Sequence, residues 1–479
     1  MCMKKIIALT CLAMLPLSYT AAEGYQANAQ SAKQSGMGHV GVALKLGVES
    51  MHFNPAGLVF MDDPVQISLG ITGVFSKGNF TDGDYKEELD NSPSTPLYVY
   101  AGFKIYDNLA AGISLTTPYG SSITWGDNWK GAQLIQEIAL ESYSIQPTIS
   151  WKITDRLSIG AGVMMMFGNI KLNRAMIGPG ELTDMAEKLI NLQPELASTA
   201  SSLLSDISLF DDISAASLKL KGNAGICWGF NVGAMFDINE KWTIGLSYRS
   251  KVTASVDEGD IELVYANQEA LTSLLSTVNQ LLPLMGIEST LSLPSLNNAT
   301  FSSEMPLPSN WNVGLSYKPN NRWIISGEVQ FVGWNAYKQL DVNLHPASEL
   351  SIYDISAVKN YKNSRVYRLG TEFAATERLD LRLGTYFDES PVEDDYLNPE
   401  TPSMNKLGIT TGFSFRPMEK LSVDFSFVYT TGFGRDGSYT DEYTLLQSLP
   451  LSDEEKERTF GGHYKVYALM PSIGITYAF

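Results

Sequence analysis

The chain has 479 residues, of which 44% are hydrophobic and 18% are charged, and its formal net charge is −18. This acidic balance excludes nucleic acid as a partner, because binding to phosphates requires a basic surface. Mean hydropathy is −0.06. Beyond about the first two dozen residues, no apolar run reaches the roughly 20 residues of a helical membrane span. The composition therefore leaves a soluble β protein or an outer-membrane barrel.

Residues 1–22 have the pattern of a secretory signal peptide, in which two lysines are followed by an apolar stretch and then by small residues. The apolar stretch has roughly a dozen residues, which is too short to anchor the chain in a bilayer. Two of the three cysteines lie within this segment, so cleavage would leave Cys227 alone. We therefore expect an exported mature chain without an internal disulfide.

From about residue 64 onward, apolar and polar residues alternate with the period of a β-strand that has one apolar face. Residues 379–387 and 421–427 show this alternation most clearly. We predict fourteen strands, at residues 65–79, 97–106, 109–117, 137–153, 156–172, 217–237, 241–256, 310–318, 322–336, 364–375, 378–388, 405–416, 420–431 and 464–479.

The connections between these strands alternate between short and long. Turns of two or three residues, such as Asp107-Asn108 and Thr154-Asp155, join consecutive strands in pairs, whereas the intervening connections are much longer. An even strand number with short turns at one end and long loops at the other is typical of a transmembrane β-barrel. We therefore predict an all-β membrane protein in which residues 63–479 form a 14-stranded antiparallel barrel.

Aromatic residues gather near the short turns, as expected for a belt at the periplasmic interface of the membrane. These residues are Tyr106, Trp151, Phe236, Trp242, Tyr317, Trp323 and Phe415. The last strand is amphipathic and ends on Phe479. A terminal aromatic residue on such a strand resembles the signal that the outer-membrane insertion machinery binds, so this machinery is an expected partner.

Residues 23–62 do not alternate, are rich in glycine and contain scattered apolar residues. A fourteen-stranded barrel has an interior that is too wide for the side chains of its wall to fill. We therefore expect this segment to form a hatch, or plug, inside the barrel. Its characteristic residues are Gly36, Gly38, Asn54, Pro55 and Ala56.

Two long extracellular loops, at residues 173–216 and 257–305, contain apolar residues at the spacing of amphipathic helices, near residues 182–210 and 264–285. The helices would either bury their apolar faces against each other or form a groove that collects apolar molecules. The candidate groove residues are Leu189, Leu196, Leu203, Leu274 and Leu281.

Three stretches of the chain resemble the FadL-type outer-membrane transporters of long-chain fatty acids and aromatic hydrocarbons. The first is GMGHVG at residues 36–41 with NPAG at 54–57. The second is TPYG at 117–120 followed by WGDNWKG at 125–131, and the third runs from 145 to 162. The strand count and the loop plan extend this resemblance over nearly the whole mature chain.

The resemblance implies passive transport of hydrophobic molecules. The ligand would be captured in the groove and would bind within the barrel. The hatch would then rearrange, and the ligand would leave sideways through a kink in the third strand, which we place at Pro118, Tyr119 and Gly120. We expect long-chain fatty acids as substrates, with aromatic hydrocarbons on the same scaffold or a general water-filled porin as alternatives. The resemblance also implies a monomer in the bacterial outer membrane, and apolar burial would drive transport.

Three arginines, Arg249, Arg368 and Arg382, are placed by strand phase on the lumenal face and are candidates to bind a fatty-acid carboxylate. The alternative is that they pair with acidic residues of the wall or with the hatch. The acidic residues predicted on the same face are Glu328, Glu372 and Asp424.

The sequence gives no support for an enzyme, a cofactor or a metal site. Its four histidines are scattered, and none has a serine or aspartate at a recognisable catalytic spacing. One mature cysteine and these histidines form no cluster of metal ligands. Acidic clusters at residues 82–90, 388–395 and 453–457 fall in predicted extracellular loops. There they are solvated, or they bind cations shared with lipopolysaccharide.

Overall fold

The structure, a computed structural model, describes residues 25–192, 207–285, 288, 290–293, 295–296, 298–442 and 452–479. The predicted signal peptide lies outside these residues. No helix among them is both long enough and apolar enough to cross a bilayer.

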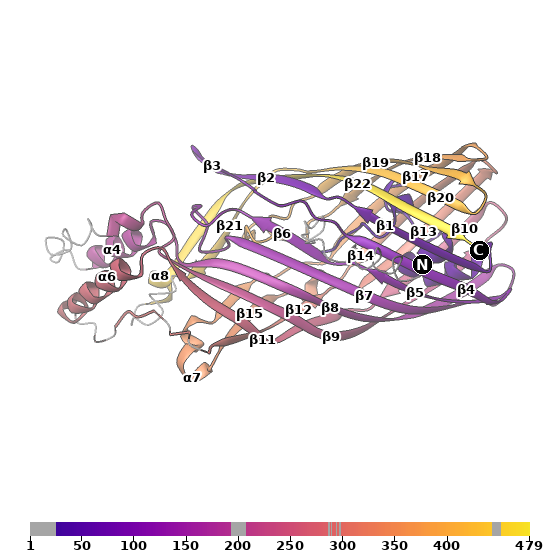
Figure 1. Ribbon diagram of the computed structural model, residues 1–479. Coiled ribbons are helices and arrows are strands. Elements are labelled where there is room, and N and C mark those ends of the chain that lie inside the picture. The colour runs from indigo at the N-terminus through magenta and orange to yellow at the C-terminus, as the bar shows by residue number, and fades with distance from the viewer. Residues whose placement is uncertain are drawn as a thin grey trace, which may run out of the picture.

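Fourteen antiparallel strands form a closed barrel, in which each strand pairs with the next and the last pairs with the first (Figure 1). This confirms the predicted fold class. In order around the wall, the strands are β1 (Val65–Thr72), β4 (Leu97–Tyr106), β5 (Leu109–Thr116), β7 (Glu137–Lys152), β8 (Leu157–Ile177), β9 (Ala216–Asp237), β10 (Trp242–Arg249), β13 (Asn310–Asn320), β14 (Trp323–Val332), β17 (Ser364–Thr376), β18 (Leu379–Asp388), β19 (Lys406–Met418), β20 (Leu421–Gly432) and β22 (Glu457–Ala478).

The sidedness of the strands is the reverse of that in a soluble protein. In β18, Leu381 and Leu383 are exposed on the outer surface, whereas Asp380 and Arg382 are buried toward the lumen. An outer surface of leucine, isoleucine and phenylalanine is stable only against lipid. The alternation of apolar and polar residues along the sequence therefore reports the lipid-facing band of the wall.

Eight further strands extend the wall at the end opposite the short turns. They are β2 (Phe75–Asp82), β3 (Tyr85–Glu88), β6 (Gly120–Thr124), β11 (Val252–Tyr265), β12 (Thr300–Leu307), β15 (Gln339–His345), β16 (Ile355–Val358) and β21 (Arg435–Glu442). Two predicted strands are divided here: residues 65–79 become β1 and β2, and residues 241–256 become β10 and β11. Beyond the bilayer the outer face no longer needs to be apolar, so alternation did not reveal most of these extensions.

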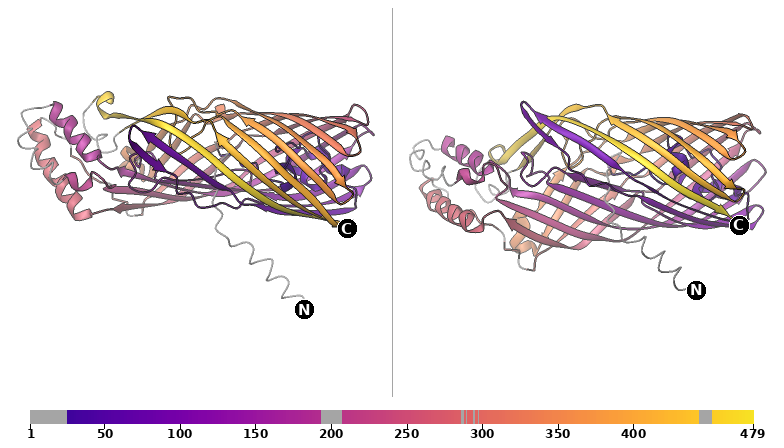
Figure 2. Two further views of the ribbon diagram at one scale, coloured as in Figure 1. Left: turned by 90° about the horizontal axis from the view of Figure 1, so that it is seen from above. Right: turned by 45° about the horizontal axis from the view of Figure 1, so that its top comes forward.

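Two helices, α4 (Glu181–Leu192) and α6 (Gln268–Leu281), project from the extended end of the barrel (Figures 1 and 2). The predicted start of the second helix was wrong, because Val264 and Tyr265 belong to β11. The helix begins at Gln268, where the side chain of Asn267 accepts a hydrogen bond from the amide of Ala270. This cap satisfies an amide that has no partner within the helix and fixes its first turn.

Aromatic side chains line the outer surface at the short-turn end. Tyr106 is 68% exposed, and the rings of Trp242 and Tyr317, on neighbouring strands, stack with 4.3 Å between their centroids. Trp323 and Phe373 form a similar pair at 4.6 Å. Amphipathic rings favour this position at the boundary between hydrocarbon and headgroups.

Candidate functional site

The N-terminal segment, residues 25–62, lies inside the barrel, and most of it is near the short-turn end (Figures 1 and 2). It contains four short helical turns: α2 (Ala32–Ser35), η2 (Gly47–Glu49), α3 (Ser50–Phe53) and η3 (Pro55–Phe60). Asn54 caps η3, because its side-chain oxygen accepts from the amide of Ala56 at 3.1 Å. Its Nδ2 donates to the carbonyls of Val42 and of Ala234 in the wall. The asparagine of the NPA sequence thus joins two parts of the segment to the barrel.

Glycines in the wall let this segment approach the barrel backbone closely. A Cβ atom at Gly245 would lie 2.0 Å from the carbonyl oxygen of Val42, and one at Gly370 would lie 2.1 Å from that of Met37. Gly38, which has a φ of +68°, adopts a conformation that other residues rarely take. Any larger side chain at these wall positions would push the segment away.

Two of the three candidate arginines are already paired with carboxylates of the wall. Arg368 Nη1 donates to Glu328 Oε1 at 2.9 Å, and Arg382 Nε donates to Glu372 Oε2 at 2.7 Å. Asp424 also lies 3.9 Å from Arg382. Their charge is therefore compensated within the protein, as in the alternative that the sequence analysis left open.

The Glu328 carboxylate also holds the N-terminal segment. Its Oε2 accepts from the amides of Gly41 at 2.9 Å and Val42 at 3.0 Å. Both Glu328 and Arg368 are buried, so their interaction is little screened by solvent. The ion pair therefore links the segment to two neighbouring strands of the wall.

Arg249 differs from the other two arginines. It is buried to 8% exposure, yet no carboxylate among the described residues lies within ion-pair distance of it. Its Nη2 donates to the backbone carbonyl of His52 at 2.8 Å and lies 3.1 Å from His52 Nδ1. Burial, together with the nearby charge of Arg249, holds the pKa of His52 well below its usual range. The imidazole is therefore neutral and accepts the hydrogen bond through Nδ1.

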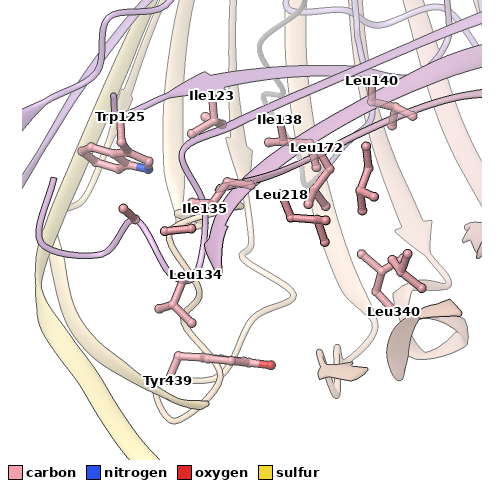
Figure 3. Close-up of a cluster of buried hydrophobic side chains, with 14 of the residues drawn as sticks. Ile123, Trp125, Leu134, Ile135, Ile138, Leu140, Leu172, Leu218, Leu340 and Tyr439 are labelled. Carbon is pink, nitrogen blue, oxygen red and sulfur yellow. The ribbon is translucent and has the colours of Figure 1, made fainter. Parts of the chain in front are cut away.

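Part of the barrel interior is occupied by a cluster of buried apolar side chains, which includes Ile123, Ile138, Leu140 and Leu172 (Figure 3). A small cavity within this part is lined by Tyr119, Leu140, Met166, Met305 and Leu307, among others. Its volume is about 40 Å³, well below the roughly 300 Å³ of the smallest usual ligand pockets. We call this cavity the apolar chamber. A long apolar ligand can enter it only if side chains or the N-terminal segment move.

The chamber lies beside an interruption in the third barrel strand. Strand β5 pairs with β7 as far as Thr116 opposite Ser144, and pairing resumes in β6 with Gly120 opposite Glu141. Residues 117–119 fall between these two ladders, and Pro118 cannot donate a backbone hydrogen bond. Of the predicted kink residues, Pro118 and Tyr119 fall within this break and Gly120 begins the resumed ladder; a lateral exit at this point stays a prediction.

The beginning of the N-terminal segment covers the break. The amide of Ala27 donates to the carbonyl of Pro118 at 2.9 Å, and that of Gly120 donates to the carbonyl of Tyr25 at 2.8 Å. Gln26 forms an antiparallel bridge with Tyr119. Residues 25–27 therefore pair with residues 118–120 as a short strand beside this break.

A buried cluster anchors this short strand. The Tyr25 hydroxyl donates to Glu400 Oε1, and Lys359 Nζ donates to Glu400 Oε2, both at 2.7 Å. The ring of Tyr25 also packs against those of Trp334 and Tyr337, with centroid distances of 6.5 and 6.0 Å. Sequence reasoning missed these residues, since no local motif relates positions so far apart in the chain.

The groove proposed between the extracellular helices stays a prediction. Leu274 is buried in α6. Leu196 and Leu203, and the side chains of Leu189 and Leu281, lie outside what the structure describes. A hollow of about 610 Å³ opens at the same end of the barrel. Its lining mixes apolar and acidic groups and includes Met176, Leu218, Asp354, Asp395 and Asp441.

One serine and one histidine that are distant in sequence meet on the extended wall. Ser302 Oγ lies 2.9 Å from His345 Nε2, across the pairing of β12 with β15. In the described part of the chain, no carboxylate is hydrogen-bonded to His345 to orient it, as a catalytic triad requires. No group of three or more histidine, cysteine or acidic side chains in that part is placed to hold a metal ion.

Comparison with known proteins agrees with this architecture. The family described as outer membrane protein transport protein (OMPP1/FadL/TodX) matches residues 13–479. The long-chain fatty acid transport protein of Salmonella typhi is 22% identical over 382 residues, covering 79% of this chain and 77% of the relative. The 47 kDa outer membrane protein of Pasteurella multocida is 23% identical over 384 residues, covering 79% and 80%.

Solved structures show the same fold. A crystal structure of a Pseudomonas aeruginosa FadL homologue matches with a TM-score of 0.73 and 17% identity, covering 95% of this chain and 100% of the homologue. The P. putida toluene transporter TodX matches with a TM-score of 0.65 and 15% identity, covering 96% and 99%. The chain therefore belongs to the OMPP1/FadL/TodX family of outer-membrane transporters of hydrophobic substrates, and it is not an enzyme.

Proposed function

We propose that this protein takes up long-chain fatty acids by passive diffusion across the outer membrane. The observation that carries the proposal is Arg249, a buried cation without a carboxylate partner among the described residues. A guanidinium binds a carboxylate through charge-assisted hydrogen bonds. The phenol of Tyr119, which lines the apolar chamber, lies near enough to interact electrostatically with this guanidinium. A headgroup at Arg249 would therefore place its tail in the chamber.

Apolar burial supplies the driving force for entry. Moving a tail from water into the chamber gains about 0.8 kcal/mol per buried methylene. The extracellular helices would collect the molecule first, in the groove to which we assign Leu189, Leu196, Leu203, Leu274 and Leu281. No energy source is required, because the gradient and the subsequent partition into lipid complete the transfer.

The N-terminal segment acts in this proposal as the hatch, residues 23–62, that closes the barrel. Gln26 and its neighbours would leave the wall, so that residues 117–120 open a lateral exit into the outer leaflet. The hydrogen bonds of Ala27 and Gly120 across this break support the assignment. A general water-filled porin is disfavoured, because the lumen holds both the hatch and an apolar chamber.

Aromatic hydrocarbons are the second candidate substrates, and one observation favours them. In the lining of the hollow at the extracellular end, Arg174 neutralises Asp441 at 3.1 Å, but Asp354 and Asp395 have no ion-pair partner among the described residues. These carboxylates would repel an anionic headgroup but not a neutral hydrocarbon. The toluene transporter TodX shares this fold, so the scaffold is compatible with both substrate classes.

Binding measurements on the protein in lipid nanodiscs test the choice. The Arg249→Met variant should bind oleate about 10- to 150-fold more weakly, the range expected when a charged hydrogen bond of about 1.5–3 kcal/mol is lost. Its affinity for toluene should not change. Arg378→Met, at an exposed short turn, is the matched control and should bind both like the wild type. Equal oleate affinity in wild type and Arg249→Met would reject the carboxylate role, and binding of toluene alone would favour the hydrocarbon.

We also propose two partners of the barrel at the membrane. Phe479 is exposed on the outer surface, and its amide donates to the carbonyl of Val65 where the barrel closes. This placement suits contact with the insertion machinery during assembly. The acidic extracellular clusters would share cations with lipopolysaccharide, and the protein would act as a monomer.

A further inference from the structure

We propose that the contact between Arg249 and His52 makes release of the hatch depend on a carboxylate. The bound headgroup would replace His52 on the Arg249 guanidinium and so free helix α3. This inference rests on the proposed function, in which Arg249 receives the headgroup. It goes further by assigning a second role to the same arginine, as the group that connects the ligand to the hatch.

Three wall side chains hold the end of α3 through its backbone carbonyls. Gln146 Nε2 donates to the carbonyl of Met51 at 2.7 Å, and Asn231 Nδ2 donates to the same carbonyl at 3.1 Å. Asn231 Nδ2 also lies 3.2 Å from the carbonyl of His52, which Arg249 Nη2 approaches to 2.8 Å. Arg249 is the only charged donor among the three, so it is the one that an anion can draw away.

A carboxylate is a stronger partner for Arg249 than the groups it now contacts. The guanidinium presents its donors as a planar fork that matches the two oxygens of a carboxylate. The present partners are a neutral carbonyl and a neutral imidazole nitrogen. An alcohol or a hydrocarbon offers no comparable pair of acceptors. A ligand shifts a conformational equilibrium only through its differential affinity for the two states, so only the anion would release α3.

The release of α3 would directly weaken the contacts that hold the rest of the hatch. Asn54 follows α3, and its Nδ2 donates to the carbonyl of Val42 at 2.7 Å. The amide of Val42 is in turn held by Glu328 in the wall. Phe53 packs against Gly41, where an added Cβ would lie 2.5 Å from the Phe53 ring. Movement at His52 therefore acts on two of the contacts that hold residues 41–43, those of Phe53 and Asn54.

Two ligands with the same tail distinguish release of the hatch by a carboxylate from release caused simply by filling the apolar chamber. Hydrogen exchange of hatch residues 45–60 is measured for the full-length protein in nanodiscs, with saturating oleate or oleyl alcohol, and binding of each is measured in the same samples. Oleate should raise exchange in this segment by about tenfold, the effect of losing one charged hydrogen bond. Oleyl alcohol, when bound, should leave exchange unchanged.

The Arg249→Met variant should exchange rapidly without ligand and should not respond to oleate, whereas Arg378→Met should behave like the wild type. If wild-type protein binds oleate but exchange in the hatch does not rise, the inference is overturned while the proposed function stands. An equal rise with oleyl alcohol also overturns it. If wild-type protein does not bind oleate, the proposed function fails and the inference fails with it. The comparison of ligands on wild-type protein decides the question even if the variant does not fold.

Discussion

Tyr25 and Glu400 are 375 positions apart in the sequence, yet the Tyr25 hydroxyl donates a 2.7 Å hydrogen bond to the Glu400 carboxylate. Lys359 neutralises that carboxylate from the other side. Because Gln26 and Ala27 follow Tyr25 directly, this contact fixes the short strand that covers the break in the wall. The extracellular loops therefore hold the covering strand in place.

Replacing Tyr25 with phenylalanine should loosen the covering strand and leave the barrel intact. Loss of a hydrogen bond to a buried charged group costs about 1.5–3 kcal/mol, so exchange of the amides of residues 25–30 should rise by at least about tenfold. Tyr106→Phe, at an exposed position on the outer surface of the barrel, serves as the control and should change nothing. Unaltered exchange in Tyr25→Phe would show that other contacts anchor the strand.

Wall glycines that face the hatch should tolerate no side chain. Gly384→Val would place a Cβ 2.3 Å from the amide nitrogen of Gly38, which is well inside the contact distance. The variant should displace the hatch and raise single-channel conductance in planar bilayers. Gly327→Val in β14, two strands away from β18, is the matched control, because an added Cβ there meets only one atom, at 3.9 Å. Equal conductance of the two variants would contradict the close packing of the hatch.

The hatch should loosen as the pH falls. Burial, with a further effect of Arg368, lowers the pKa of His39 to about 3, and burial lowers that of His52 as well. In the docked hatch the two imidazoles resist protonation. In the undocked hatch they bind protons below the ordinary histidine pKa of about 6.5. Docking should therefore be unaffected above pH 7. Between pH 6.5 and about 3 it should lose about 1.4 kcal/mol per pH unit through His39, and His52 should add a loss of the same sign.

Bilayer conductance measured from pH 7.5 to 4.5 checks this dependence, since an undocked hatch opens the lumen. Wild-type conductance should rise toward low pH. The double variant His39→Gln, His52→Gln should show a flatter profile, because glutamine does not titrate. Parallel profiles for the two proteins would assign the effect to other groups.

The Glu328 carboxylate should be important for both the wall and the hatch. Glu328→Ala removes the buried carboxylate that pairs with Arg368, a loss that typically costs about 3–5 kcal/mol, and it removes the acceptor for the amides of Gly41 and Val42. The melting temperature should fall and conductance should rise. The double variant Glu328→Leu, Arg368→Leu should recover much of the melting temperature but not the closed channel. Recovery of both would show that the carboxylate does not hold the hatch.

The barrel could be predicted because lipid imposes a pattern on each strand. Leu381 and Leu383 must face hydrocarbon, so Arg382 between them faces the lumen. Apolar and polar residues therefore alternate with a period of two. The extracellular extensions were missed because water imposes no such pattern: β3 carries Lys86 beside Glu87 and Glu88. The predicted helix at Val264 failed for a related reason, since its apolar residues serve a strand that packs within the extended wall.

The candidate site could be predicted only as far as strand phase reaches. Phase placed Arg249, Arg368 and Arg382 on the lumenal face, but it could not say which was paired. Pairing depends on register, and Arg368 lies directly opposite Glu328 and Arg382 opposite Glu372. Arg249 instead lies between two asparagines, Asn231 and Asn310. Whether an arginine is paired therefore depends on the register between strands, and the sequence of a single strand does not reveal it.

The lateral exit is tested most directly by locking the covering strand to the wall. In a Cys227→Ser background, Gln26→Cys and Tyr119→Cys place two thiols on residues that pair directly. Oleate transfer from the external medium into proteoliposome membranes is then compared before and after reduction. A second protein with Thr72→Cys and Ser472→Cys, whose hydroxyl oxygens are 2.7 Å apart where the barrel closes, controls for cross-linking itself. The account predicts that the Gln26–Tyr119 disulfide abolishes transfer, that reduction restores it, and that the control transfers oleate in both states. Equal transfer by the oxidised and reduced Gln26–Tyr119 protein would contradict an exit through residues 117–120.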